Sequence, residues 1–166
     1  MTYDPTGRHR RSIRLAGHDY AQPGTYFVTV VCRERALLLE DPGFRLAVEA
    51  GWCWLADRYE YLHLDEYVVM PNHLHGLVVI GDTCRGGSRT APTARVKRKP
   101  LGRLIGAFKT VSTKRINELR GTPGATVWQR NYYEHIIRDE EELNRVRQYI
   151  ADNPARWQQD PENPVL

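Results

Sequence analysis

The strongest constraint on the fold of this chain lies in residues 61–80, where two strand-like runs are separated only by Pro71-Asn72. Residues 61–70 (YLHLDEYVVM) and 73–80 (HLHGLVVI) are rich in β-branched and aromatic side chains, which favour extended structure. The Pro-Asn pair between them indicates a tight turn. These residues therefore predict an antiparallel β-hairpin.

Five further segments show the composition or periodicity of regular structure. They are a strand at 24–32 (GTYFVTVVC), a helix at 42–59, a helix with an apolar stripe at 101–120, a strand at 128–138 (WQRNYYEHIIR) and a final helix that begins at Asp139. Asp139 at the N-cap with Glu142 three residues later resembles a capping box, and Pro154 limits this helix at Asn153.

The predicted order of elements is strand, helix, two hairpin strands, helix, strand, helix. Because strands and helices do not alternate regularly, this order favours an α+β fold in which helices pack on one face of an antiparallel sheet. The length of 166 residues suits a single domain, 1–166, with a basic N-terminal arm at 1–20 and a flexible basic loop at 82–100.

The composition is that of an ordinary globular protein, with 41% hydrophobic and 27% charged residues. The sequence lacks the long apolar run, of about eighteen residues, that a membrane span requires. The N-terminus is polar and rich in arginine, without the apolar stretch of a secretion signal. We therefore expect a cytoplasmic protein with no membrane partner. Its cysteines, Cys32, Cys53 and Cys84, form no CxxC pair and are expected to be reduced.

The formal net charge is only +4, but the positive residues are unevenly distributed. Residues 85–120 contain eleven Lys or Arg against one acid, Glu118, and a second arginine cluster lies in the N-terminal arm. Such excesses predict phosphate-binding surfaces, whereas the alternative is a solvated surface that keeps the protein soluble. The candidate DNA-binding residues are Arg10, Arg11, Arg14, Arg95, Lys97, Arg98, Lys99, Arg103 and Lys109.

The second hairpin strand contains the triplet His73-Leu74-His75. Residues two apart in a strand point to the same face, so the two imidazoles project together and suit two nitrogen ligands of one divalent metal. Two protein ligands leave open positions for substrate oxygens, as in catalytic sites. Gly76 beside them is a position where another backbone or a ligand approaches closely. The alternative is a pair of hydrogen-bonded structural histidines.

The final helix offers a further ligand from a distant part of the chain. Tyr149 and Asn153 are four residues apart, so a phenol and an amide oxygen share one helix face. Pro154 disfavours helical geometry at Asn153, which weakens this spacing argument. The alternative is that Tyr149 is a core aromatic residue and Asn153 a C-cap.

Several stretches together resemble a known family. MPNHLHGLVVI and WQRNYYEHIIRDEEELNRVRQYIADNP are similar to the single-tyrosine HUH transposases, and more closely to the REP-associated tyrosine transposases. The stretches RRSIRLAGHDY, GTYFVTVVC and YIADNPARW also match that pattern, so the resemblance extends over about residues 10–157.

The resemblance implies an RRM/ferredoxin-like antiparallel sheet packed against helices. It implies that His73 and His75 are metal ligands, that Tyr149 is the nucleophile and that Asn153 takes the place of a third ligand, where some related transposases have glutamine. It further implies Mg²⁺ or Mn²⁺ as cofactor, no small-molecule cofactor, single-stranded or hairpin DNA as partner, and a monomer or homodimer.

The implied reaction is attack of the Tyr149 oxygen on a phosphodiester that a bound metal ion polarises. It leaves a 5′-phosphotyrosine and a free 3′-hydroxyl. A second 3′-hydroxyl can then reverse the step and join a new strand without ATP. The protein is therefore expected to cleave and rejoin DNA, in transposition or in the processing of REP-type hairpin repeats.

Two other functions remain open from the residues alone. A non-catalytic single-stranded nucleic-acid-binding module explains the charge but not the paired histidines. A metal-dependent hydrolase of small molecules explains the histidines but not the basic surface. For His135, a DNA contact or a hydrogen bond that supports the metal ligands is as consistent with the sequence as a structural role. Tyr132 and Tyr133 are expected to pack in the fold or to stack on bases.

Overall fold

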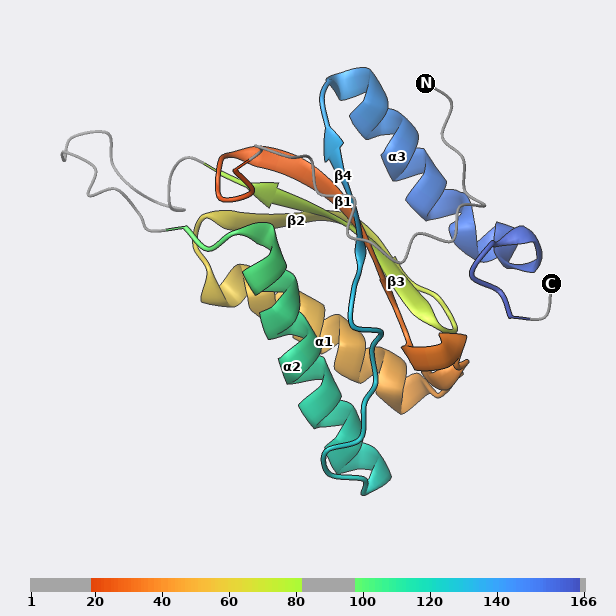
Figure 1. Cartoon of the computed structure of the whole chain (residues 1–166). Helices are drawn as coiled ribbons and strands as arrows, with labels where there is room; N and C mark the ends of the chain where they lie inside the picture. The colour runs from red at the N-terminus through yellow and green to blue at the C-terminus, as the bar shows by residue number, and fades with distance from the viewer. Residues whose placement is uncertain (1–18, 82–97, 165–166) are drawn as a thin grey trace.

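The computed structural model describes residues 19–81 and 98–164, and within these ranges the chain forms one four-stranded sheet and three α-helices (Figure 1). The elements are β1 (Gly24–Val31), α1 (Pro42–Arg58), β2 (Leu62–Val69), β3 (His73–Ile80), α2 (Leu101–Arg120), β4 (Tyr133–Ile137) and α3 (Glu140–Asp152). Short 3₁₀ helices are η1 (Arg33–Arg35), η2 (Leu38–Glu40) and η3 (Asn153–Gln159). The candidate residues Arg10, Arg11, Arg14, Arg95 and Lys97 lie outside the described residues.

The sheet has the strand order β2-β3-β1-β4, and every neighbouring pair is antiparallel. The unit β1-α1-β2 and the unit β3-α2-β4 therefore interleave, because β3 lies between the strands of the first and β1 between those of the second. This is the ferredoxin-like arrangement, which confirms the predicted α+β fold. The predicted hairpin is confirmed as β2 and β3, joined through Pro71-Asn72, with the Met70 N–H donating to the His73 carbonyl at 2.8 Å.

The fourth strand is shorter than the sequence predicts. Trp128 makes only an isolated bridge to Cys32, and regular pairing with β1 begins at Tyr133. The cause is Lys109 on α2, whose ammonium donates to the carbonyls of Gln129, Arg130 and Asn131 at 2.7, 3.4 and 2.9 Å. These carbonyls thus accept hydrogen bonds from a side chain and not from a neighbouring strand.

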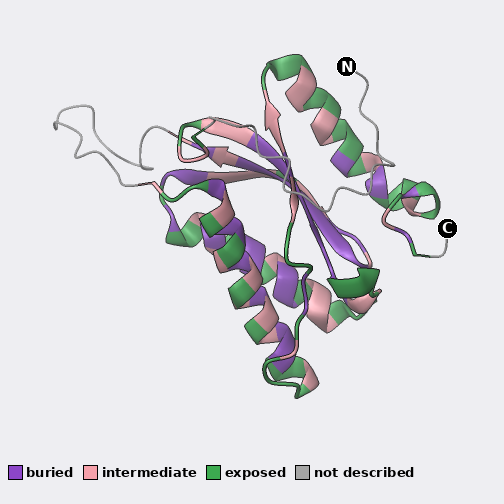
Figure 2. Ribbon diagram, in the orientation of Figure 1, coloured by how far each residue is buried: buried purple, intermediate pink, exposed green. Residues whose placement is uncertain are grey.

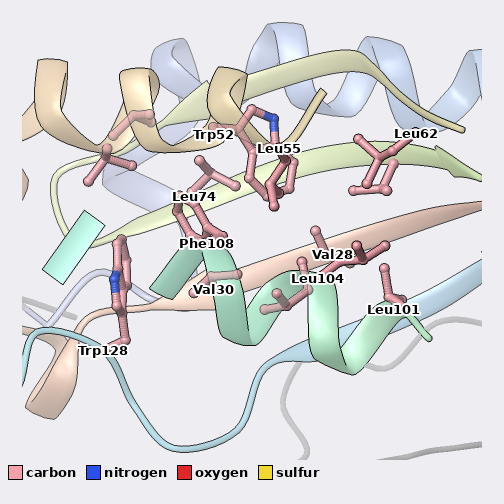
Figure 3. Close-up of a cluster of buried hydrophobic side chains, with 14 of the residues drawn as sticks. Val28, Val30, Trp52, Leu55, Leu62, Leu74, Leu101, Leu104, Phe108 and Trp128 are labelled. Atoms are coloured by element: carbon pink, nitrogen blue, oxygen red, sulfur yellow. The ribbon is translucent and has the colours of Figure 1, made fainter. Parts of the chain in front are cut away.

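The main core lies between the sheet and helices α1 and α2 (Figures 2 and 3). Alternate residues of β1 and β3 face these helices, with Val28 and Leu74 fully buried. Trp52 of α1 packs edge-on against Phe108 of α2, with ring centroids 5.1 Å apart and planes at 85°. Asp41 is the N-cap of helix α1, and its carboxylate accepts the backbone N–H groups of Gly43 and Phe44.

Gly76 of β3 lies against this core. A Cβ at Gly76 would lie 2.6 Å from Cζ2 of Trp52, so only glycine permits this packing. The close approach predicted at this position is made by a tryptophan side chain, and it occurs on the sheet face opposite to His73 and His75.

Helix α3 packs on the second face of the sheet, which differs from the expectation that helices cover one face (Figure 1). The reason is that β1 and β3 carry apolar residues on both faces. Phe27 and Leu77 lie on the second face, and Ile150 of α3 packs against them and buries them. A bidentate salt bridge also ties α3 to β2, with Arg147 Nε and Nη2 at 3.1 and 2.6 Å from the Asp65 carboxylate. Among the helices described here, none combines the length and apolarity of a membrane span.

Candidate active site

His73 and His75 project from β3 toward the face that carries α3. Both side chains are buried, at 0% and 4% exposure. Their Nε2 atoms lie 3.0 Å apart and their ring centroids 4.4 Å apart. The sequence expectation that both imidazoles share one sheet face is confirmed, and the two nitrogens converge on one point.

Asn72 orients the imidazole of His73. Its side-chain N–H₂ donates to the carbonyls of Arg35 and Glu162 at 3.2 and 2.6 Å, so its amide oxygen must be the atom 2.7 Å from His73 Nδ1. Because that oxygen only accepts, the proton of neutral His73 lies on Nδ1 and the lone pair lies on Nε2. This is the tautomer that binds a metal through Nε2.

The imidazole of His75 is held in place from the neighbouring strand. The hydroxyl of Thr29 lies 2.8 Å from His75 Nδ1, and Phe27 stacks on the imidazole at 5.4 Å. Burial lowers the pKa of His73 to about 3, with the nearby Arg35 guanidinium as a second cause. Burial, and then His73, hold the pKa of His75 well below its ordinary value. Both imidazoles are therefore neutral at neutral pH, as metal ligands must be.

Asp160 lies beside this histidine pair, although it follows α3 and η3 near the C-terminal end of the described chain. Its carboxylate Oδ2 is 3.6 Å from His73 Nε2, and the residue is only 4% exposed. Its Oδ1 accepts the Glu162 N–H at 2.7 Å, whereas Oδ2 has no hydrogen-bond partner within residues 19–81 and 98–164. Burial raises the pKa of Asp160 because the carboxylate loses water.

One ligand atom from each of His73, His75 and Asp160 lies within 4.8 Å of the others. Two neutral imidazoles beside a buried carboxylate with one orphaned oxygen form a donor set that fits a divalent cation. This group can therefore hold a metal ion. Asp160 was not predicted from the sequence, because it lies far along the chain from the histidines and no local pattern marks it.

Tyr149 of α3 lies at the open side of the pair. Its hydroxyl is 3.3 Å from His75 Nε2, and its ring stands edge-on to Phe27 with centroids 6.0 Å apart. The residue is 37% exposed, so its oxygen lies where the buried histidines meet solvent. The structure thus brings together three residues that were selected from the sequence, His73, His75 and Tyr149.

Asn153 keeps helical geometry, with φ −57° and ψ −42°, even though Pro154 follows it. The chain continues through Pro154 as η3, which tolerates proline near its start. Asn153 thus retains the spacing of four residues from Tyr149 and is 3% exposed. Its role as a ligand remains a prediction.

His135 contacts the first turn of α3. Its Nε2 lies 2.7 Å from Glu142 Oε1, and the other oxygen of Glu142 accepts the backbone N–H of Arg138 at 2.8 Å. Asp139 caps the helix by accepting the Glu142 N–H, as the sequence predicts. His135 and Glu142 therefore join β4 to the helix that carries Tyr149.

The candidate DNA-binding residues in the described ranges differ in their surroundings. Arg103 is exposed on α2. The Lys99 ammonium donates to the Tyr59 hydroxyl at 3.3 Å, and the Lys99 N–H donates to the Tyr61 hydroxyl at 3.0 Å. Lys109 holds three backbone carbonyls, and α2 packs on the sheet face opposite to α3 (Figure 1). The structure thus does not bring Arg103 and Lys109 to the histidine pair.

Comparison with solved structures identifies a class that shares this fold. A REP-associated tyrosine transposase, solved bound to a REP hairpin, superposes with a TM-score of 0.60 at 19% identity over 87% of this chain and 74% of that chain. A structure described as a transposase of Deinococcus radiodurans gives a TM-score of 0.45 at 18% identity, over 84% of this chain and 97% of the other. The match with the REP-associated tyrosine transposase confirms, at the level of the fold, the resemblance inferred from the sequence.

Comparison of sequences gives a nearer relative. An uncharacterized protein of Haemophilus influenzae is 34% identical, over 95% of this chain and 95% of its own. The present chain belongs to the same family as that protein. No family model matches the sequence.

Proposed function

We propose that this protein is a single-tyrosine HUH transposase, which cleaves and rejoins single-stranded DNA in a metal-dependent reaction. One observation carries the proposal: the Tyr149 hydroxyl lies 3.3 Å from Nε2 of His75, whose partner His73 converges on the same point. A nucleophile beside two neutral, oriented imidazoles is the geometry that phosphodiester transfer needs.

In the proposed reaction the Tyr149 oxygen loses its proton and forms a bond to phosphorus, while the bond from phosphorus to the 3′-oxygen breaks. The leaving 3′-oxygen takes up a proton, and the 5′-phosphate stays on Tyr149. Attack by another 3′-hydroxyl reverses these bond changes and joins a new strand. A divalent cation held by the histidines, Mg²⁺ or Mn²⁺, would stabilise the charge that develops on the phosphate oxygens.

The surrounding side chains would set the geometry of this attack. Phe27 contacts the rings of both His75 and Tyr149, so it fixes the nucleophile relative to the ligand. The Arg147–Asp65 salt bridge lies one half-turn before Tyr149 and holds α3 on the sheet. Asn153, one turn after Tyr149, is proposed as a neutral amide ligand.

The proposed substrate is single-stranded DNA that folds into a hairpin. The structural neighbour bound to a REP hairpin supports this choice, and so does the excess of basic residues between Arg85 and Arg120. The proposed process is transposition or the local processing of REP-type repeats. A cytoplasmic location and a monomeric or homodimeric state belong to the same proposal.

The test is formation of a covalent adduct. The purified protein is incubated with Mn²⁺ and a library of labelled DNA hairpins that carry randomised single-stranded flanks, and denaturing gels reveal DNA that migrates with protein. We expect an adduct that peptide mapping places on Tyr149. DNA binding without any adduct would instead support a non-catalytic nucleic-acid-binding module.

Tyr149→Phe removes the oxygen and keeps the ring against Phe27. This variant should lose cleavage and the adduct while it retains DNA and metal binding. Tyr133→Phe is the matched control, because Tyr133 also packs against Phe27, with centroids 6.2 Å apart, and should still form the adduct. Tyr132→Phe should behave likewise. An adduct that persists in Tyr149→Phe would overturn the assignment of the nucleophile.

A further inference from the structure

We propose that Asp160 supplies the negatively charged ligand of the metal site and that residues 153–163 therefore form one wall of the active site. The inference rests on the metal site of the proposed function and identifies its anionic member. The geometry is that of two imidazoles and one carboxylate, with ligand atoms within 4.8 Å of one another.

The carboxylate of Asp160 is buried with one oxygen unsatisfied. The residue is 4% exposed, and its Oδ2 has no hydrogen-bond partner in the parts of the chain that the structure describes. This oxygen lies 3.6 Å from Nε2 of His73, which Asn72 holds in the neutral tautomer with its lone pair directed into the site. A buried carboxylate that faces a lone pair is costly unless a cation lies between them. A divalent ion satisfies both atoms at once.

Asp160 is also held in place by the chain around it. The carbonyl of Asp160 accepts the Asn163 N–H at 2.9 Å, and its Oδ1 accepts the Glu162 N–H at 2.7 Å, so residues 160–163 form a compact turn. Asn72 donates to the Glu162 carbonyl at 2.6 Å, so the residue that orients His73 also anchors this turn.

Arg35 makes the remaining anchors. Its Nε lies 3.0 Å from Glu162 Oε2, and its Nη1 donates to the Pro161 carbonyl at 3.2 Å. The backbone of Arg35 has φ +55°, a left-handed conformation that is uncommon for a residue other than glycine. The contacts that Arg35 and Asn72 make with residues 160–163 thus position the carboxylate of Asp160 beside the imidazole of His73.

The ligand set also indicates the class of ion. Imidazole nitrogens suit first-row transition metals, whereas Mg²⁺ prefers an all-oxygen shell and keeps its waters. Of the two ions in the proposed function, Mn²⁺ is the transition metal and accepts imidazole nitrogens more readily, so two imidazoles with one carboxylate favour Mn²⁺ over Mg²⁺. The wild-type protein should bind Mn²⁺ more tightly than Mg²⁺ in the absence of DNA.

The test measures metal binding on the full-length protein without DNA. Titration calorimetry and the electron paramagnetic resonance signal of free Mn²⁺ give the dissociation constant, and the shift of the melting temperature with Mn²⁺ gives an independent readout. Asp160→Asn keeps the shape and removes the charge, so it should weaken Mn²⁺ binding by about tenfold or more and reduce the shift at a given Mn²⁺ concentration. Asp160→Ala, which also removes the ligand oxygen, should do the same.

Asp152→Asn is the matched control, because it makes the same change of charge at the end of α3, where Asp152 accepts from Gln148 and pairs with Arg156. It should bind Mn²⁺ like the wild type. Asn153→Ala tests the other proposed ligand. Because Asn153 is neutral, its loss should weaken Mn²⁺ binding less than the loss of Asp160.

The outcomes distinguish this inference from the proposed function. If the wild type binds Mn²⁺ and Asp160→Asn binds it equally well, Asp160 is not a ligand, while the histidine site stands. If His73→Ala, His75→Ala and Asp160→Asn all bind like the wild type, the metal site itself is wrong. If only Asp160→Asn and the histidine variants lose binding, the three-residue site is established.

Discussion

The hydroxyl of Thr29 on β1 lies 2.8 Å from Nδ1 of His75 on β3, and the two residues are direct partners in the strand register. This hydrogen bond is buried and fixes the ring so that Nε2 faces His73 and Tyr149. The pairing of β1 with β3 thus orients one of the two proposed metal ligands.

Loss of this hydrogen bond should weaken metal binding. Thr29→Val keeps the volume and removes the hydroxyl, and groups that orient metal-binding histidines typically contribute ten- to a hundredfold to affinity. We expect a loss of about tenfold or more in Mn²⁺ affinity by titration calorimetry. Thr29→Ser, which retains the hydroxyl, should stay within a few-fold of wild type. Equal weakening in both variants would indicate a packing effect.

The two histidines should act as one unit. His73→Ala and His75→Ala should each abolish metal-dependent DNA cleavage, and the double variant should be no worse than either single one, because both residues serve one ion. Filter-binding measurements should show that most DNA affinity remains. Full cleavage activity in either single variant would exclude the proposed site.

Gly76→Ala should destabilise the fold. The new methyl group would meet the Trp52 ring at 2.6 Å, and forced overpacking of this kind costs about 1–3 kcal/mol of unfolding free energy. Urea denaturation measures the change. Gly106→Ala on α2 is the control, since a Cβ there meets nothing within 4 Å and alanine favours a helix. A Trp52→Phe background should recover part of the loss.

The basic segment before α2 should contribute to DNA binding through charge. Alanine at Arg95, Lys97, Arg98 and Lys99 should weaken binding most at low salt. The slope of log K against log salt should become shallower by about 0.7 for each phosphate of single-stranded DNA that the protein no longer neutralises. Binding titrations between low and moderate salt give the slope, and an unchanged slope would show that these residues do not bind phosphate.

The metal-free protein should lose stability as the pH falls. The unfolded chain protonates its histidines near the ordinary pKa of 6.5, whereas burial holds the pKa of His73 at about 3 and that of His75 well below 6.5. Between these values the unfolded state binds more protons, so the unfolding free energy decreases as the pH falls through this window. Thermal melts in a chelating buffer should show this trend.

Asp160 has the opposite effect on the pH dependence of stability. Burial raises its pKa above 3.8, so its protonation at low pH removes a buried charge and favours the folded state. His75→Gln removes one buried imidazole, so its melting temperature should depend less steeply on pH between 6.5 and about 5 than that of the wild type. Equal dependence in both proteins would show that His75 does not contribute.

The sequence alone determined the features that depend on local spacing. The alternation in residues 73–80 placed His73 and His75 on one strand face, and the Pro71-Asn72 pair defined the hairpin. The apolar stripe in residues 101–120 predicted α2 with its observed bounds. Such patterns repeat every two or 3.6 residues, so they can be read without knowledge of the partner surface.

Only the tertiary structure decided which distant residues meet. Asp160 lies beside His73 because Asn72 and Arg35 bind the turn at 160–163. No local sequence pattern predicts these contacts between η1, the hairpin turn and this segment. The position of α3 on the second sheet face follows from the burial of Phe27 on a strand that is apolar on both sides. Side-chain contacts between remote segments depend on packing, and packing is a property of the whole fold.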